Sequence, residues 1–191
     1  MVSKLVQTCI ASVVLKTTAN LVIQLVNQKG ETHLPSIDTF RLFQFALFGL
    51  LSAPVNSFWQ QLLERSFPTR KTPQTNDADA RASKDTGKAL PGPQSHADIE
   101  WVNVFTKLAL DQLIGLFVMN TIFLSCMNIG NWYDPPLVIH DIQQKVFSIT
   151  KAGWKIWPMV ALTNFIFVPT DMRVIVASCV GFGWNMFLSL F

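Results

Sequence analysis

The stretch Leu42–Leu63, LFQFALFGLLSAPVNSFWQQLL, contains 22 residues without one charged side chain. A helix of about 20 apolar residues crosses the hydrocarbon core of a bilayer, so this stretch is long enough to span it. Three further stretches have the same character: Leu5–Val26, which carries only Lys16, Gln112–Tyr133 and Val174–Phe191. The sequence therefore predicts an all-α integral membrane bundle with four main spans.

The composition also favours a bilayer over water as the surroundings of these helices. Charged residues make up 14% of the chain, compared with about 25% in ordinary soluble domains. Of the 15 basic and 12 acidic residues, 12 lie between Glu64 and Glu100, so the remaining chain is more apolar still. The alternative is a soluble helical protein with a large apolar core. Helices of that kind have one apolar face, whereas these stretches are apolar nearly all round.

A polar segment at residues 67–99 divides the chain. It holds four prolines and many small polar residues, and its charges are balanced in sign. Such a segment buries too little apolar surface to offset the entropy of ordering, so we predict a disordered linker. We expect a single membrane domain over residues 1–191, with two spans in its first half (1–66) and the other spans in its second half (100–191).

Two shorter elements complete the second half. Ile156–Val168 is uncharged but has only 13 residues, which is short for a full span, and whether it crosses the bilayer stays open. Leu137–Gly153 has apolar residues at helical spacing, which predicts an amphipathic helix at the membrane interface. The alternative is a helix that packs on a neighbour in the water phase. Aromatic residues flank this segment as in an interfacial belt: Trp132, Tyr133, Trp154 and Trp157.

Polar residues recur at every fourth position of the first span. They are Lys4, Thr8, Ser12, Lys16, Asn20, Gln24 and Gln28. Residues four apart lie above one another on a helix, so they form a stripe on an otherwise apolar surface. Polar groups within hydrocarbon normally face protein or water. Lys16, Asn20 and Gln24 are therefore expected either to line a hydrated path or to bond to neighbouring helices, and both interpretations stay open.

A second polar cluster consists of Lys107, Asp111 and Gln112. Lys107 and Asp111 are four residues apart, so they can pair along one helix. The alternative is that Asp111 pairs with a base on another helix, for which Lys16 is the candidate among the charges within spans. Asp111 and Gln112 thus join the stripe as candidate pore-lining or interhelical polar residues.

No catalytic or metal-binding motif is apparent. The histidines His33, His96 and His140 are scattered among a loop, the linker and the amphipathic segment. The three cysteines lie inside apolar stretches without CxxC spacing, which is typical of small buried hydrophobic residues. The net charge of +3 comes without a basic cluster interleaved with aromatics, so nucleic acid is not expected as a partner. We expect neither catalysis nor a cofactor nor a metal site.

The last fifth of the chain carries a specific signature, WxxWP, NFxxVPxxxR and WNxxLS. It is formed by Trp154, Trp157, Pro158, Asn164, Phe165, Val168, Pro169, Arg173, Trp184, Asn185, Leu188 and Ser189. The signature resembles that of the Mpv-seventeen and Sym-one family, which includes the twenty-two-kilodalton peroxisomal membrane protein. Earlier stretches agree more loosely. The Gly-Asp pair of the family's first span is replaced here by Ala19 and Asn20.

The resemblance implies a multi-pass protein of the mitochondrial inner membrane or the peroxisomal membrane, and we favour the former. It also implies pore- or channel-like passage of small metabolites, so we expect a contribution to the solute permeability of an organelle membrane. The alternative is a scaffold or sorting protein without a pore. The expected partners are the lipid bilayer and small solutes of unknown identity, and a homo-oligomer is compatible with these features. The basic residues indicate no orientation.

Parts of the signature have a physical explanation. Pro158 suits the first turn of a helix, where its missing N–H is not needed. Trp154 and Trp157 suit the membrane interface just before that turn. Pro169 ends the short helix.

The last span begins near Arg173, whose guanidinium carries five N–H donors in one plane. We expect a fixed partner for it, either exposed carbonyls near Pro169 or the carboxylate of Asp111 or Asp171. Every fourth residue from Arg173 is small or polar: Ala177, Gly181, Asn185 and Ser189. Small residues at this spacing allow helices to approach closely, so this edge is expected to be a helix-packing face.

Overall fold

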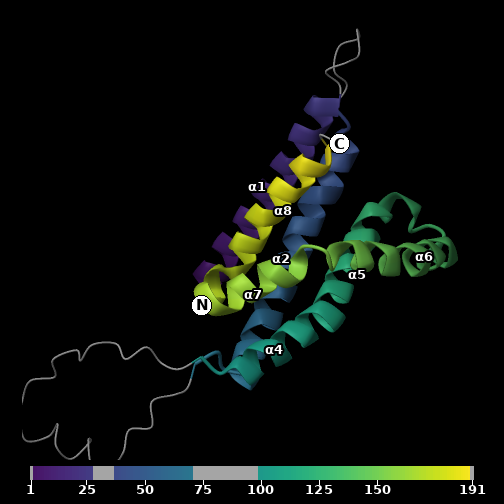
Figure 1. Cartoon of the computed structure of the whole chain (residues 1–191). Helices are drawn as coiled ribbons and strands as arrows, with labels where there is room; N and C mark the ends of the chain where they lie inside the picture. Colours follow the sequence, from purple (N-terminus) through teal and green to yellow (C-terminus); the bar gives the residue numbers. More distant parts are fainter. Residues whose placement is uncertain (1, 28–36, 71–98, 190–191) are drawn as a thin grey trace, which may run out of the picture.

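The computed structural model describes residues 2–27, 37–70 and 99–189 (Figure 1). Within these ranges the regular structure is helical, apart from an isolated bridge between Arg70 and Ile99. The elements are α1 (Val2–Asn27), α2 (Thr39–Ser66), α4 (Trp101–Leu110), the π-helix η1 (Asp111–Gly115), α5 (Leu116–Met127), η2 (Ile129–Asn131), α6 (Pro135–Gly153), α7 (Trp157–Phe167), η3 (Thr170–Met172) and α8 (Arg173–Ser189). Most of the predicted linker, residues 71–98, lies outside the described residues.

Three helices are long and apolar enough to cross a membrane: Lys4–Val26, Thr39–Ser66 and Trp101–Met127. The first two agree with the predicted spans. The third corrects a prediction, because α4, η1 and α5 form one continuous helix that begins at Trp101 and ends before Tyr133. The charges of its first half have partners inside the bundle, so they do not force the helix to begin later. Helix α8 has 17 residues, and a fourth span stays a prediction.

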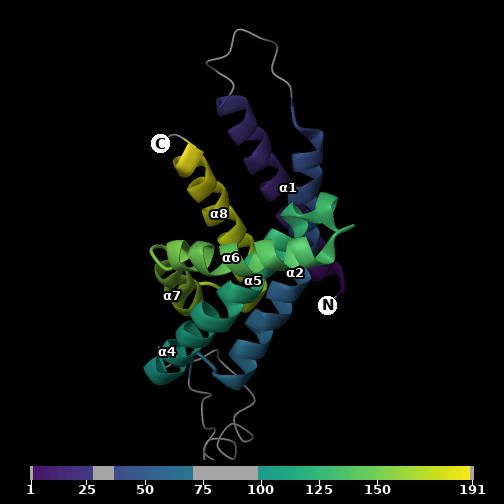
Figure 2. The ribbon, with the colours of Figure 1, turned by 90° about the vertical axis from the view of Figure 1, so that its right-hand side faces the viewer.

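Helix α1 packs between α2 and α8, and the three run side by side in both views (Figures 1 and 2). The approach to α2 is close at Gly49. A Cβ atom added there would lie 2.7 Å from the Val13 Cα atom and 3.0 Å from the Ser12 carbonyl oxygen. Only glycine leaves room for the two backbones at this distance, as in other tightly packed membrane helices.

Helix α6 crosses the long helices (Figure 2) and packs on α5. Its buried face consists of Val138, Val146 and Thr150, and the Asn120 side-chain amide on α5 donates to the Thr150 hydroxyl at 3.0 Å. The amphipathic helix predicted over Leu137–Gly153 is therefore present, with a helical neighbour under its buried face. Its position at a membrane interface stays a prediction.

Helix α7 begins with Pro158 in its first turn and ends just before Val168 and Pro169. It has 11 residues, and at 1.5 Å per residue it covers about half of the hydrocarbon thickness, so α7 alone is too short for a full span. Trp157 precedes Pro158 and lines an internal cavity. The small residues Gly153 and Gly181 leave room for its ring, and its place in an interfacial belt stays a prediction.

Candidate functional site

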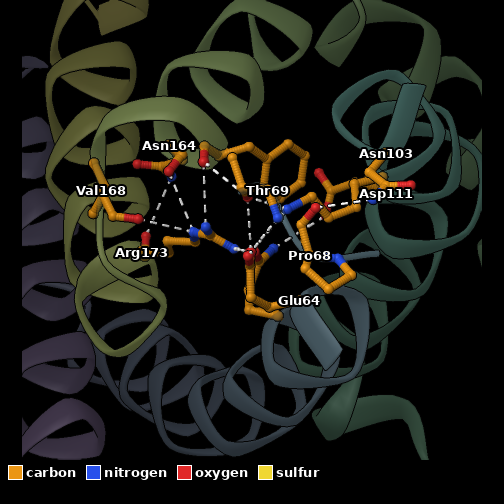
Figure 3. Close-up of polar contacts among 11 residues, drawn as sticks. Glu64, Pro68, Thr69, Asn103, Asp111, Asn164, Val168 and Arg173 are labelled. Atoms are coloured by element: carbon orange, nitrogen blue, oxygen red, sulfur yellow. Dashed lines mark hydrogen bonds and ion pairs between the residues drawn. The ribbon is translucent and has the colours of Figure 1, made fainter. Parts of the chain in front are cut away.

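Glu64 lies in the last turn of α2 and is the centre of a buried charge cluster formed by Glu64, Lys107 and Arg173 (Figure 3). Its Oε2 atom lies 2.8 Å from Lys107 Nζ and 2.8 Å from Arg173 Nη1. The side chains of Lys107 and Arg173 are 0% and 4% exposed. Removing a cation from water is unfavourable by several kcal/mol unless it is paired. The shared carboxylate therefore allows α2, α4 and α8 to meet here.

The chain that leaves α2 is fixed to the same carboxylate. The Thr69 backbone N–H donates to Glu64 Oε1 at 2.9 Å, and the Thr69 hydroxyl donates to Oε2 at 3.1 Å. Across the linker, the Glu100 N–H donates to the Thr69 carbonyl at 3.0 Å. The Asn103 side chain donates to the Pro68 carbonyl at 3.0 Å. These bonds hold the two ends of the linker together beside the charge cluster, as Figure 3 shows for Pro68 and Asn103.

Arg173 also binds the carbonyl end of α7. Its Nε donates to the carbonyls of Asn164 and Val168 at 3.2 and 3.1 Å, and its Nη2 donates to the Phe165 carbonyl at 3.4 Å. The last carbonyls of a helix have no intrahelical donor, and Pro169 prevents α7 from continuing. The guanidinium supplies several of these donors at once, as the sequence led us to expect for carbonyls near Pro169.

The carboxylate partner of Arg173 differs from the two that were expected. It is Glu64, not Asp111 or Asp171. Asp171 lies on the exposed turn before α8 and pairs with Lys4 at 2.8 Å. Asp111 and Asp171 were expected because they lie close in sequence to Lys107 and Arg173. Glu64 precedes both cations by more than 40 residues, so sequence proximity does not reveal it.

The ring of Phe165, 2% exposed, lies against both cations of the charge cluster. Its centroid is 5.1 Å from Lys107 Nζ and 5.2 Å from Arg173 Cζ. Cations attract the negative face of an aromatic ring within about 6 Å. The Asn-Phe pair of the signature therefore contributes two carbonyls and a ring to one centre.

Asp111 begins the π-helix η1 and is surrounded by neutral donors. Its Oδ1 accepts from Trp59 Nε1 at 3.1 Å and from Gln60 Nε2 at 3.2 Å, and its Oδ2 accepts from Gln112 Nε2 at 3.2 Å. Both predicted ion pairs of Asp111 are wrong. Lys107 pairs with Glu64, while Lys16 donates to the Ser52 hydroxyl.

Gly115, at the other end of η1, permits this arrangement. A Cβ atom there would lie 2.6 Å from Trp59 Nε1 and 3.1 Å from Asp111 Oδ1. A side chain at this position would therefore displace the indole from the carboxylate. Single π-turns within longer helices are frequent at functional sites.

A cavity of about 310 Å³ lies among α1, α2, η1, α5, α7 and α8. Its polar lining includes Lys16, Ser52, Gln60, Asp111, Gln112 and Asn164. The cavity therefore brings together three of the five polar residues that the sequence singled out: Lys16 from α1, and Asp111 and Gln112 from η1.

The other two, Asn20 and Gln24, are buried in contacts between α1 and the start of α2. Gln24 Nε2 donates to Asn20 Oδ1 at 2.8 Å and to the Asp38 carbonyl at 3.2 Å, and the Asp38 N–H donates back to Gln24 Oε1 at 2.8 Å. The structure places them outside the cavity lining. Their contacts favour the interhelical interpretation over the pore-lining one.

The remaining signature residues occupy distinct places. The Trp154 indole donates to the Gln112 carbonyl at 3.2 Å, which links α6 to η1. Trp184 and Asn185 lie in α8, where the structure does not describe their side chains. Sequence reasoning missed Thr69 and Gln60 as members of these centres. One sequence signal could have identified Glu64 as a member of the charge cluster. Lys107 lies within an apolar helix, and a buried lysine requires an acidic partner.

The sequence of the chain is similar to those of known proteins. The model of the Mpv17 / PMP22 family matches residues 133–189, which include the whole signature. PXMP2/4 family protein 3 of Dictyostelium discoideum is 28% identical over 147 residues, covering 77% of this chain and 64% of the relative. Protein SYM1 of Debaryomyces hansenii is 27% identical over 157 residues, covering 80% of this chain and 66% of the relative.

A relative from Caenorhabditis elegans, mitochondrial inner membrane protein Mpv17, is 33% identical over 91 residues, covering 44% of this chain and 46% of the relative. The chain thus spans less than two thirds of the length of these relatives. No solved structure matches. Over residues 133–189 the chain thus matches the Mpv17 / PMP22 family, and its three membrane-length helices agree with the membrane protein named among its relatives.

Proposed function

We propose that this chain contributes to the passage of small polar solutes across the mitochondrial inner membrane. One observation carries the proposal: a cavity of about 310 Å³, whose mainly apolar wall includes several polar side chains, lies among helices of membrane-spanning length. Polar and ionisable groups inside a membrane bundle are unfavourable and usually mark a path for water or solutes. The name of the Caenorhabditis elegans relative, mitochondrial inner membrane protein Mpv17, supports the choice of this membrane.

Helix α8 is the fourth span in this proposal. At 1.5 Å per residue its 17 residues cover about 26 Å, which is close to the roughly 30 Å hydrocarbon core. It packs against α1, and its residues from Arg173 to Phe182 form part of the cavity wall. A four-span bundle would thus enclose the cavity on the side that α8 covers.

A scaffold or sorting protein without a pore is the second candidate. The contacts of Asn20 and Gln24 favour it, because these polar groups bond within the bundle and not toward the cavity. In that case the cavity would be a packing feature, and solutes would not cross.

The two candidates differ in the flux of small neutral solutes through liposomes that contain the purified chain. We expect flux for the unmodified protein and a marked reduction for Ala177→Phe, which fills the cavity from α8. The matched control is Met159→Phe, because Met159 is 74% exposed on the outer face of α7. The absence of flux from the unmodified protein at several protein-to-lipid ratios would favour the scaffold.

A further inference from the structure

We propose that Lys16 binds the carboxylate group of a small organic anion in the cavity, so that the solutes of this bundle are anions. The site consists of the Lys16 ammonium, the Ser52 hydroxyl and the Asn56 amide. The proposal rests on the proposed function only in taking this anion for a solute that crosses the membrane. Binding itself can be measured without transport.

Lys16 is a cation near the middle of a membrane-length helix. It lies within the 23-residue stretch Lys4–Val26, and at 1.5 Å per residue either end of this stretch is roughly 15 Å away or more. Lysines close to a helix end can extend to the headgroups, but this distance is too long for a lysine side chain. The ammonium must therefore be satisfied inside the bundle.

The contacts of Lys16 suit a charged ammonium but supply no negative charge. Its Nζ donates to the Ser52 hydroxyl and lies 4.1 Å from the centroid of the Phe48 ring, and an aromatic face attracts a cation. In the part of the chain that the structure describes, no carboxylate lies within ion-pair distance of Lys16. An ammonium has three N–H donors, and the Ser52 hydroxyl accepts only one of them.

The other charges at the cavity wall compensate one another. Asp111 and Arg173 line the cavity together with Lys16, and Arg173 attracts the Asp111 carboxylate at longer range. Arg173 in turn shares Glu64 with Lys107, so these four residues carry two positive and two negative charges. Lys16 therefore leaves the described cavity wall with one positive charge in excess, which favours an anion inside it.

Two polar side chains of α2 complete the site. Ser52 and Asn56 both line the cavity, and because they are four residues apart they lie one above the other on one face of the helix. Asn56 is half-buried, and its amide has no hydrogen-bond partner among the described residues. The amide carries two N–H donors, and a carboxylate accepts at both oxygens. One carboxylate can therefore bind the ammonium and the amide together.

The wall beside Lys16 also suits an alkyl stem. Phe45 and Phe48 line the cavity, and their rings pack edge to face with that of Phe123 at centroid distances of 6.0 and 5.3 Å. The cavity of about 310 Å³ is larger than the roughly 150 Å³ that holds benzene in another protein. A carboxylate with a short alkyl chain therefore fits both the charge and the volume of this region.

The test is a calorimetric titration of the purified full chain in detergent with sodium butyrate near neutral pH. Butyramide has the same shape without the charge, and n-propylammonium chloride carries the opposite charge. We expect saturable binding of butyrate alone. Lys16→Met keeps the length of the side chain and removes the charge. It should weaken butyrate binding by at least about tenfold, because a hydrogen bond to a charged group is lost.

A second variant keeps the test valid if Lys16→Met does not fold. Asn56→Asp keeps the size of the side chain and places a carboxylate one helical turn from Ser52, where it can pair with Lys16. Butyrate binding should then be lost. The control is Lys4→Met, because Lys4 lies on the same helix but pairs with Asp171 on the exposed surface. Its affinity for butyrate should equal that of the unmodified chain.

Passage of the anion is measured separately, in planar bilayers across a gradient of potassium methanesulfonate, whose organic anion stays ionised. The reversal potential should show that methanesulfonate passes more readily than potassium, and Lys16→Met should lose this preference. Equal passage of both ions through the unmodified chain, or a preference for potassium, would overturn the assignment of anions as the solutes.

Three results would overturn the site: no binding of butyrate, equally tight binding of butyramide, or unchanged affinity in folded Lys16→Met and Asn56→Asp. Butyrate binding without solute flux in liposomes would keep the site and remove the proposed permeability. Flux of neutral solutes without butyrate binding would do the reverse.

Discussion

Glu64 and Asp111 are both acids on membrane-length helices, but their partners differ in kind. Glu64 receives two buried cations, and its cluster joins α2, α4, α7 and α8. Asp111 receives three neutral N–H donors and lines the cavity. A carboxylate that neutralises two buried cations stabilises the fold, whereas one that is held by neutral donors alone contributes less. The comparison thus favours an architectural role for Glu64, whereas Asp111 lies at the wall of the cavity on which the proposed function rests.

The largest expected effect is that of Glu64→Gln. It leaves Lys107 and Arg173 buried without a countercharge, which should destabilise the fold by about 3–5 kcal/mol. Thermal unfolding in detergent measures this change. The control is Asp171→Asn, because the exposed Lys4–Asp171 pair should contribute little. A melting temperature of Glu64→Gln equal to that of the control would contradict an architectural role.

Arg173→Lys should have the next largest effect. An ammonium cannot reach the carbonyls of Asn164, Phe165 and Val168 and the Glu64 carboxylate at once, so we expect a loss of about 1–3 kcal/mol and a larger loss for Arg173→Ala. Thermal unfolding of the three proteins in one detergent gives the order. Equal melting temperatures for Lys and Arg would reduce Arg173 to an interfacial anchor.

Asp111→Asn should change stability less than either substitution. Its donors are neutral, and Gln112 can turn its amide to accept from the new side chain, so we expect a change of about 1 kcal/mol or less. Thermal unfolding in the same detergent measures the stability of Asp111→Asn relative to the other two variants. A loss as large as that of Glu64→Gln would mean that Asp111 is part of the architecture, and the contrast between the two acids would disappear.

A third acid, Asp141 on α6, provides the smallest effect. Its hydrogen bonds with Lys145 and Asn128 hold the pKa of Asp141 below its ordinary value of 3.8. A depressed folded-state pKa adds stability above the unfolded pKa, and this contribution disappears as the pH falls through the folded value. Asp141→Asn should therefore melt slightly lower than the unmodified chain at pH 7, with the difference vanishing as the pH falls well below the ordinary pKa of 3.8. If the difference in melting temperature persists at low pH, it arises from the packing of the side chain and not from its charge.

The sequence was sufficient for features that depend on local composition. Apolar runs with one charge or none predicted the helices at Leu5–Val26 and Leu42–Leu63, and Pro158 and Pro169 predicted the limits of α7. A proline that ends a helix leaves free carbonyls, so the carbonyl partners of Arg173 could also be expected.

Features that depend on distant partners were not predictable in this way. The third membrane-length helix begins at Trp101 because Lys107 is neutralised by Glu64, 43 residues earlier. The π-turn at Asp111 has no local sequence signal, and it depends on Trp59 of another helix fitting against Gly115. Periodicity identifies which residues are polar, but not which of them meet.

The central claim is that the polar cavity is open to water inside the membrane bundle. The most direct measurement is thiol labelling in liposomes of Asn56→Cys and Phe58→Cys, made in a chain whose native cysteines are replaced. Asn56 lines the cavity, whereas Phe58, two residues later on α2, is 69% exposed on the outer surface. We expect a small, charged, water-soluble thiol reagent to modify the cysteine at 56 and not the one at 58. Equal protection of both positions would contradict a hydrated cavity.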